Sequence, residues 1–259
     1  MLELEKYANN LFLIFTSQGI VVTESDLNFL LPLQTVASLN LTILGVHVDK
    51  NQLMLRAECH LSEAALSQKG IKICPVKPLL LQVTHKAQLT LMRAYHWYNW
   101  DTHSQFCGKC GAKLQSQAET TEKKCTHCQQ SYFPRFSPAV MVLIQKEDKI
   151  LLARSPHFQP GIYSAIAGFI DIGESAEAAA HREVKEEVGL EITDLKYFAT
   201  QLWPFPDCLM IAFTAKYVSG EIKCDFNEIE DAKWFSINQL PDLPKSVSIA
   251  RQLIDSACV

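Results

Sequence analysis

Three glutamates in the C-terminal half have the spacing of a metal site. Glu183, Glu186 and Glu187 stand at positions i, i+3 and i+4 of a segment expected to be helical, so the pattern places all three carboxylates on one helix face. Like charges at this spacing destabilise an isolated helix, whereas hard carboxylate oxygens are preferred ligands of Mg²⁺ and Mn²⁺. The spacing therefore predicts a divalent-metal site formed by these three side chains. The alternative is a solvated acidic helix face, which is common in proteins.

The residues around the glutamates favour a helix from about 175 to 188. Four alanines fill its first turns, and Gly189 is placed to end it. We expect Arg182 and the loop before the helix to hold Glu174 and to orient the acidic set. The sequence thus supplies both the helix and the groups that would fix its carboxylates.

Four of the nine cysteines follow the spacing C-x2-C-x14-C-x2-C, which is typical of zinc sites: Cys107, Cys110, Cys125 and Cys128. Two facing Cys-x2-Cys turns would give four thiolates in a tetrahedral arrangement, which suits Zn²⁺. Because sulfur fills every position, we expect the zinc to be structural, without an open position for substrate. The alternatives are a pair of disulfides or four free thiols. His127 could compete as a ligand but is expected to be exposed, and the other five cysteines are expected to be small buried apolar residues.

The acidic segment resembles the signature of the Nudix hydrolases, G-x5-E-x7-R-E-U-x-E-E-x-G-U, in which U is aliphatic. Its positions are filled without a departure by Gly168, Glu174, Arg182, Glu183, Val184, Glu186, Glu187, Gly189 and Leu190. Nudix enzymes hydrolyse a nucleoside diphosphate linked to another moiety, so the resemblance implies this reaction class. It also implies an α/β (α+β) fold, the Nudix α/β/α sandwich with a mixed sheet.

A second group of residues resembles the motif of one branch of this family. Residues 201–208 read Gln-Leu-Trp-Pro-Phe-Pro-Asp-Cys, similar to the S-Q-P-W-P-F-P-x-S array of the NADH pyrophosphatases, also described as NAD-capped RNA hydrolases. Thr200, Leu202 and Cys208 depart from that array. Two prolines stiffen such a segment, and two aromatic rings offer flat apolar faces to a base. The alternative is a proline-rich turn with core aromatics.

The resemblance to this branch implies a role for each matching residue. Glu183, Glu186 and Glu187 resemble the catalytic glutamates of the family. Among them, Glu183 and Glu187 look like metal ligands, and Glu186 resembles a ligand or the group that activates water. Glu228 resembles an additional acidic ligand, and the backbone carbonyl of Ala167 a further metal contact. Phe133, where the family often has tyrosine, and Phe169 resemble a pair that stacks on nicotinamide. The implied substrate-binding residues are Phe133, Phe169, Gln201, Leu202, Trp203, Pro204, Phe205, Pro206, Asp207, Cys208 and Ala250.

The implied reaction is hydrolysis of the central pyrophosphate of NAD(H) to NMN(H) and AMP. On 5′ NAD-capped RNA the same cut would leave 5′-monophosphate RNA. The resemblance implies two or more catalytic Mg²⁺ or Mn²⁺ ions, one structural Zn²⁺ and a homodimer. Two alternatives stay open: a Nudix hydrolase of ADP-ribose or dinucleoside polyphosphates, or a non-catalytic nucleotide-sensing or RNA-binding zinc-ribbon protein. Five basic residues near the cysteines fit either RNA contacts or a solvated surface: Lys109, Lys113, Lys123, Lys124 and Arg135.

Three regions are expected to position these residues. Residues 1–102 are predicted to form a small α+β domain without chemistry of its own, with a helix from about Ala87 to Trp97. Residues 103–133 are predicted to form the zinc ribbon, and residues 134–259 the Nudix hydrolase domain. In the last region we expect strands at 139–144, 150–153, 209–217 and 232–235 and a helix around 246–256.

The composition is that of a folded protein: 48% of the 259 residues are hydrophobic and 20% are charged, which excludes disordered and collagen-like chains. No apolar run approaches the ~18 residues of a membrane helix, so we expect no membrane partner. Acidic residues stand where a signal peptide has basic ones, so we expect a cytoplasmic protein. Residues 137–259 hold 11 basic and 18 acidic residues, and cations would be needed between such a surface and an anionic diphosphate.

Overall fold

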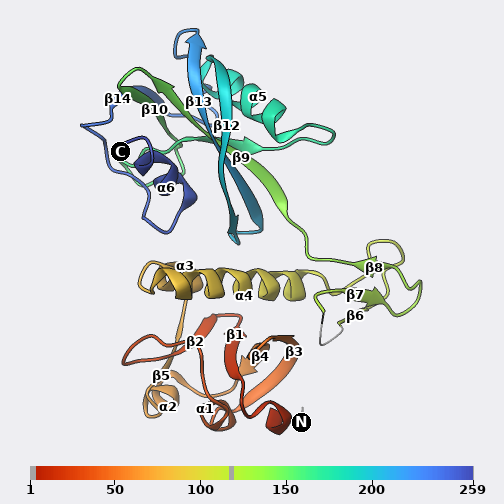
Figure 1. Cartoon of the computed structure of the whole chain (residues 1–259). Helices are drawn as coiled ribbons and strands as arrows, with labels where there is room; N and C mark the ends of the chain where they lie inside the picture. The colour runs from red at the N-terminus through yellow and green to blue at the C-terminus, as the bar shows by residue number, and fades with distance from the viewer. Residues whose placement is uncertain (1–3, 117–119, 259) are drawn as a thin grey trace. The chain divides into compact units, whose positions relative to one another are not determined.

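The computed structural model describes residues 4–116 and 120–258 (Figure 1). The chain divides into two compact units, Met1–Arg135 and Phe136–Val259. The finer division into three domains remains a prediction. In the described part of the chain, no helix has both the length and the apolar character needed to cross a membrane.

The first unit contains a five-stranded sheet. Its strands are β1 (Leu11–Thr16), β2 (Gly19–Thr23), β3 (Leu41–Asp49), β4 (Gln52–Cys59) and β5 (Ile71–Cys74). They lie in the order β3-β4-β1-β2-β5, with β1 and β4 parallel and the other neighbours antiparallel. The short helices are η1 (Leu4–Tyr7), α1 (Leu33–Ala37), α2 (Glu63–Ser67) and α3 (Val76–Leu80). Both faces of β1 are buried, since Phe12 and Ile14 join one apolar cluster while Phe15 stacks on Tyr98.

The long helix of this unit, α4, spans His85–His103 and extends the predicted helix at both ends. Leu91, Ala94 and Trp97 are buried as an amphipathic pattern requires, but Leu89 is 52% exposed. Leu89 therefore lies outside the buried apolar face of the helix.

The cysteine segment forms a three-stranded sheet from β6 (Leu114–Ser116), β7 (Lys123–Cys125) and β8 (Ser131–Tyr132). A buried ion pair joins it to α4. The Lys123 ammonium lies 2.9 Å from a carboxylate oxygen of Asp101 and donates to the Ser104 carbonyl at 2.8 Å. Lys123 is only 3% exposed, so it is not one of the exposed basic residues near the cysteines, contrary to the expectation from its position in the sequence.

The second unit contains a six-stranded mixed sheet. Its strands are β9 (Ser137–Lys146), β10 (Lys149–Arg154), β11 (Ile166–Phe169), β12 (Glu191–Trp203), β13 (Cys208–Ser219) and β14 (Asp231–Ser236). The main order is β12-β13-β9-β10-β14, and β11 also pairs with β9. β13 is parallel to β9, and the other pairs are antiparallel.

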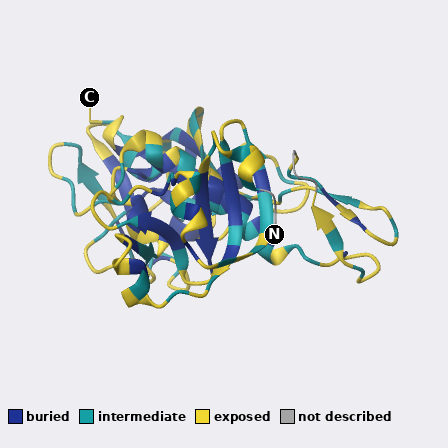
Figure 2. Ribbon diagram, turned by 90° about the horizontal axis from the view of Figure 1, so that it is seen from below, coloured by how far each residue is buried: buried dark blue, intermediate teal, exposed yellow. Residues whose placement is uncertain are grey.

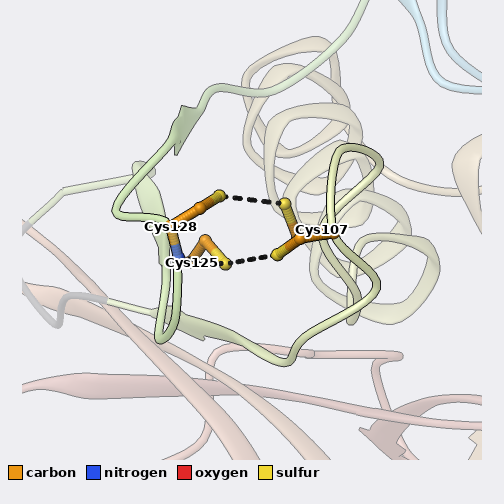
Figure 3. A group of neighbouring side chains, drawn as sticks. Cys107, Cys125 and Cys128 are labelled. Atoms are coloured by element: carbon orange, nitrogen blue, oxygen red, sulfur yellow. Dashed lines mark hydrogen bonds between the residues drawn. The ribbon is translucent and has the colours of Figure 1, made fainter.

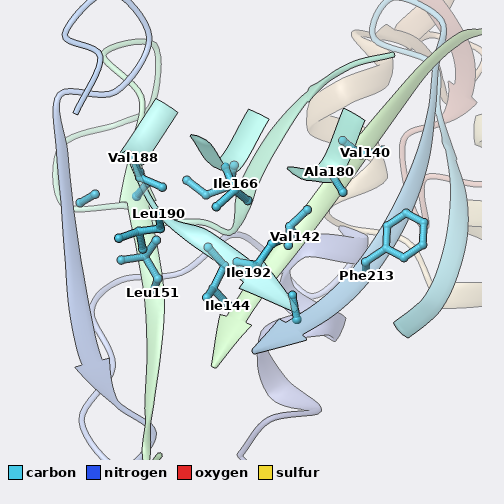
Figure 4. Packing of buried hydrophobic residues seen from close by; sticks show 14 of the residues in the cluster. Val140, Val142, Ile144, Leu151, Ile166, Ala180, Val188, Leu190, Ile192 and Phe213 are labelled. Carbon is cyan, nitrogen blue, oxygen red and sulfur yellow. The ribbon is translucent and has the colours of Figure 1, made fainter. Parts of the chain in front are cut away.

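Two helices cover the two faces of this sheet, α5 (Ala176–Val188) and α6 (Ile249–Asp255). Val140, Val142 and Ile144 of β9 pack in the cluster that includes α5 (Figure 4). The intervening residues Met141 and Leu143 pack in the cluster that includes α6. This alternation follows from the two-residue period of a strand, and it confirms the α/β/α sandwich. In Figure 2 the buried residues gather on the strands, whereas the connecting loops are mostly exposed.

Candidate active site

The helix that carries the glutamates has defined ends. Ser175 is its N-cap, and the Ser175 hydroxyl accepts from the Ala178 N–H at 3.1 Å. Gly189 ends the helix with φ 74°, a left-handed conformation that glycine adopts without strain. Helix α5 starts one residue after the predicted position and ends at the predicted one.

Two helix glutamates and one loop glutamate come together. Glu183, Glu187 and Glu228 each place a carboxylate oxygen within 4.8 Å of the others. We call these three residues the acidic cluster. Glu186 lies outside it, and its side chain is 59% exposed. The reason is helix geometry, because residues four apart lie about 40° apart around the axis whereas residue i+3 is rotated about 60° the other way.

The loop that carries Glu228 is hydrogen-bonded to the C-terminal end of α5. The Asp225 N–H donates to the Glu187 carbonyl at 3.0 Å, and the Lys223 N–H donates to the Val188 carbonyl at 2.9 Å. The Glu228 N–H donates in turn to the Asp225 carbonyl at 3.0 Å. Carbonyls that the helix end leaves unpaired therefore fix the third carboxylate.

Arg182 joins the loop before the helix to the acidic residues. Its guanidinium binds Glu174 through two hydrogen bonds, Nε–Oε1 at 2.9 Å and Nη2–Oε2 at 2.8 Å. It also donates to the Phe169 carbonyl at 2.9 Å, and to Glu183 and Glu186 at 2.8 and 3.0 Å. The expected hold of Arg182 on Glu174 is confirmed.

Burial makes two members of the acidic cluster, Glu183 and Glu187, costly to charge. It raises the pKa of Glu187 to about 8, with added repulsion from Glu183 and Glu228. Burial also raises the pKa of Glu183, against the opposing effect of Arg182. Oε2 of Glu187 is buried and has no hydrogen-bond partner in the described part of the chain. Closely spaced carboxylates with an unpaired buried oxygen fit a divalent cation.

A cavity of about 760 Å³ opens at the cluster. The cavity is lined by these residues named from the sequence: Ala167, Gly168, Phe169, Arg182, Glu183, Glu186, Glu187, Cys208 and Glu228. It also contains residues that the site predictions missed: Ala139, Asp171, Met210 and Asp225. Met210 stands two positions after Cys208 on one strand, so strand periodicity could have found it.

The segment 201–208 forms the end of the β12–β13 hairpin. Trp203 pairs with Cys208 in the strand register, and the Trp203 and Phe205 rings meet edge to face with centroids 5.4 Å apart. Asp207 accepts from the Ser137 hydroxyl at 3.0 Å. Of this segment, Cys208 lines the cavity.

The other substrate contacts predicted from the sequence lie in different surroundings. The Gln201 amide binds backbone groups of Val247 and Ile249. Ala250 is 4% exposed and packs in the α6 cluster. Phe169 is 56% exposed at the cavity, and Phe133, in the first unit, is 62% exposed. Their substrate contacts remain predictions.

The four spaced cysteines also converge, with their sulfur atoms within 4.8 Å of one another. Figure 3 shows three of them, Cys107, Cys125 and Cys128, pointing toward a common centre. The Cys107 and Cys128 sulfurs lie 3.6 Å apart, and those of Cys110 and Cys125 lie 3.4 Å apart. This donor set fits Zn²⁺. A hydrogen bond with the Tyr132 hydroxyl, 3.1 Å away, lowers the pKa of Cys107 to about 6.

The expected exposure of His127 is confirmed, whereas the expected burial of the five cysteines outside this group is confirmed for only one of them. His127 is exposed, as expected. Of the five scattered cysteines, Cys208 alone is buried; Cys59, Cys74 and Cys224 are half-buried and Cys258 is exposed. The expectation that all five are buried was therefore wrong, because several lie at strand ends or near the C-terminus.

Comparisons with known proteins agree with this architecture. The family model described as "NUDIX domain" matches residues 135–256. A protein of Pseudomonas aeruginosa (strain LESB58) named "NAD-capped RNA hydrolase NudC" is 51% identical over 156 residues, which cover 60% of this chain. That match spans only 56% of the length of the Pseudomonas protein.

A longer match is found in Chromobacterium violaceum. Its protein of the same name is 42% identical over 231 residues, covering 88% of this chain and 85% of that protein. Among solved structures, a NUDIX hydrolase from Nitrosomonas europaea is 19% identical with a TM-score of 0.47, covering 60% of this chain and 88% of that one. The Chromobacterium protein is matched over most of its length. The chain therefore belongs to the NUDIX family and, within it, to the NudC branch.

Proposed function

We propose that the chain is a metal-dependent diphosphatase that cleaves the central pyrophosphate of NAD(H) to NMN(H) and AMP. On 5′ NAD-capped RNA the same cut would leave 5′-monophosphate RNA. The observation that carries the proposal is the acidic cluster, in which Glu183, Glu187 and Glu228 meet at the wall of a cavity. Relatives named NAD-capped RNA hydrolases support the choice of substrate.

The acidic cluster and Glu186 would hold the catalytic cations, two or more Mg²⁺ or Mn²⁺, with the Ala167 carbonyl as a further contact. When bound, such cations neutralise phosphate charge and lower the pKa of a bound water. The chain's own residues would then bind and orient the substrate. Phe169 at the cavity offers a ring to the nicotinamide, and Arg182 keeps Glu183 and Glu186 in place through charged hydrogen bonds.

The proposal extends to the rest of the molecule. The four-cysteine group would hold one structural Zn²⁺, because sulfur supplies all four ligands. Two copies would form a homodimer, as the resemblance implies. The enzyme would act in the cytoplasm, a reducing compartment, and the nine cysteines, all within the described residues, are free thiols.

The test is release of AMP from NADH and of 5′-monophosphate RNA from NAD-capped RNA, each with Mg²⁺ or Mn²⁺ and with EDTA. We expect turnover that EDTA abolishes and that Glu187→Gln reduces at least ~100-fold. Glu177→Gln is the matched control, since Glu177 is an exposed glutamate of the same helix. Near-full turnover by Glu187→Gln would refute the site. Binding of NADH without turnover would favour a nucleotide sensor, and faster hydrolysis of ADP-ribose would favour another substrate class.

A further inference from the structure

The side chain of Gln201 is occupied at both of its polar ends. Its Nε2 donates to the Val247 carbonyl at 2.8 Å, and its Oε1 accepts from the Ile249 N–H at 2.8 Å. Both partners are backbone groups of residues that are less than 5% exposed. The amide therefore spans the backbone on either side of Ser248.

These bonds complete the start of α6. Ser248 is the N-cap of α6, and its hydroxyl accepts from the Arg251 N–H at 3.3 Å. Ile249 is the first helical residue, and its N–H has no partner within the helix. The Gln201 carbonyl oxygen supplies that partner from another strand, so one side chain fixes the first turn of α6 to the end of β12.

We call the two hydrogen bonds from Gln201 to Val247 and Ile249 the clamp. The sheet register connects this clamp to the cavity. Phe169 pairs with Ala139, Ala139 with Met210, and Met210 with Gln201, so the four residues form one row across β11, β9, β13 and β12. Paired residues of neighbouring strands point to the same face of a sheet. The first three residues of the row line the cavity, and we call them the cavity floor. Gln201 continues this row beyond the floor, where its amide meets the backbone before α6.

We infer that Gln201 is a positioning residue that holds Val247–Ile249 against the end of the cavity floor, and that it does not contact the substrate. The inference rests on the proposed function for its effect on catalysis. Through its two hydrogen bonds, Gln201 links the β12–β13 hairpin to the start of α6, so that the two segments hold each other in position. Ala250, the second residue of α6, directly follows the clamped backbone.

The chemistry of the clamp requires an amide of this length. Glutamate at position 201 would keep an acceptor for the Ile249 N–H but would place a carboxylate oxygen against the Val247 carbonyl. Leucine would leave both backbone groups unpaired in a part-buried place, which costs more than the bonds themselves contribute. The two variants thus separate loss of the donor from loss of the whole clamp.

The experiment combines hydrogen exchange of the substrate-free chain with NADH kinetics for Gln201→Leu and Gln201→Glu. Gln239→Leu is the control, since Gln239 is an exposed glutamine of the same unit. We expect Gln201→Leu to speed exchange in residues 247–252 about tenfold and to raise KM for NADH about tenfold, with kcat changed less than ~3-fold. Gln201→Glu should keep the Ile249 amide protected and raise KM less.

Each of the other possible results contradicts either the positioning role of Gln201 or the proposed function. If KM rises while exchange in 247–252 stays unchanged, Gln201 contacts the substrate directly and the positioning role is overturned. If exchange rises while KM is unchanged, the clamp does not shape the site, and the role is again overturned. Absence of NADH turnover by the wild-type chain would instead overturn the proposed function, and with it the part of the inference that concerns catalysis.

Discussion

A side chain at Gly168 could not coexist with the carboxylate of Glu183 in its observed position. A Cβ atom added to Gly168 would lie 2.0 Å from the carboxyl carbon of Glu183 and 2.2 Å from both of its oxygens. Gly168 belongs to β11 and Glu183 to α5, so the two meet where the helix crosses the sheet edge. The first glycine of the signature therefore creates the space that the Glu183 carboxylate occupies.

Gly168→Ala should displace Glu183 and lower kcat/KM for NADH at least ~100-fold while the chain remains folded, because one misplaced ligand disrupts the site. Kinetics and circular dichroism would measure the two effects. Gly108→Ala is the control, since a Cβ there would meet only the Tyr132 hydroxyl, at an ordinary 3.8 Å. Equal activity of both variants would contradict the steric argument.

The metal-free protein should lose stability as pH rises from 6 to 8. The folded-state pKa of Glu187 is about 8, above the ~4.3 of an unfolded glutamate. The stabilising contribution is therefore complete below the unfolded value and is lost as pH rises through 8. We expect urea unfolding with EDTA to show a loss of about 2 kcal/mol over this range, absent in Glu187→Gln. Mn²⁺ should offset the loss, because the cation replaces the proton. An equal pH slope in Glu187→Gln would assign the titration to another group.

Arg182→Lys should weaken both the fold and the metal site. Lysine cannot reproduce the paired hydrogen bonds to Glu174 and still reach Glu183 and Glu186. We expect a loss of about 2 kcal/mol in the free energy of unfolding and about tenfold weaker Mn²⁺ binding. Arg251→Lys, which alters a surface i,i+4 pair with Asp255, should cost less than ~0.5 kcal/mol. Wild-type Mn²⁺ affinity in Arg182→Lys would show that the arginine does not orient the carboxylates.

The purified chain should contain one zinc ion, and Cys125→Ser should lose it together with thermal stability. Elemental analysis and thermal unfolding measure the two quantities. Cys258→Ser should keep its zinc, since Cys258 is an exposed thiol outside the cluster. Full zinc content in Cys125→Ser would exclude the four-cysteine site.

Lys123→Met should destabilise the chain by about 3 kcal/mol, because it leaves the buried Asp101 with one fewer cation. Lys124→Met, at the exposed neighbouring position, should change the free energy of unfolding by less than ~0.5 kcal/mol. Denaturant unfolding compares the two. If Lys123→Met lowered affinity for NAD-capped RNA without any loss of stability, Lys123 would be a nucleic-acid contact.

Both helices of the second unit and four of its six strands were predictable because their signals are local, whereas β11 and β12 were not predicted. Short apolar runs next to turn residues predicted strands β9 and β13, and the alanines with Gly189 predicted helix α5. The cysteine spacing likewise predicted a cluster of four sulfurs, since two tight turns form from their own short sequences. Such features depend on residues that are close together in the chain, so the sequence pattern alone is enough to predict them.

What the sequence by itself determined was the signature, the secondary structure that carries it and the cysteine group. What the tertiary structure decided was which side chains meet. The packing of α5 left Glu183 and Glu187 buried and Glu186 exposed, and backbone hydrogen bonds at the end of α5 brought in Glu228. Long-range packing also brought the Gln201 side chain to the backbone of Val247 and Ile249 at the start of α6. These relations depend on long-range packing and on competition among backbone groups for partners, and a single sequence records neither.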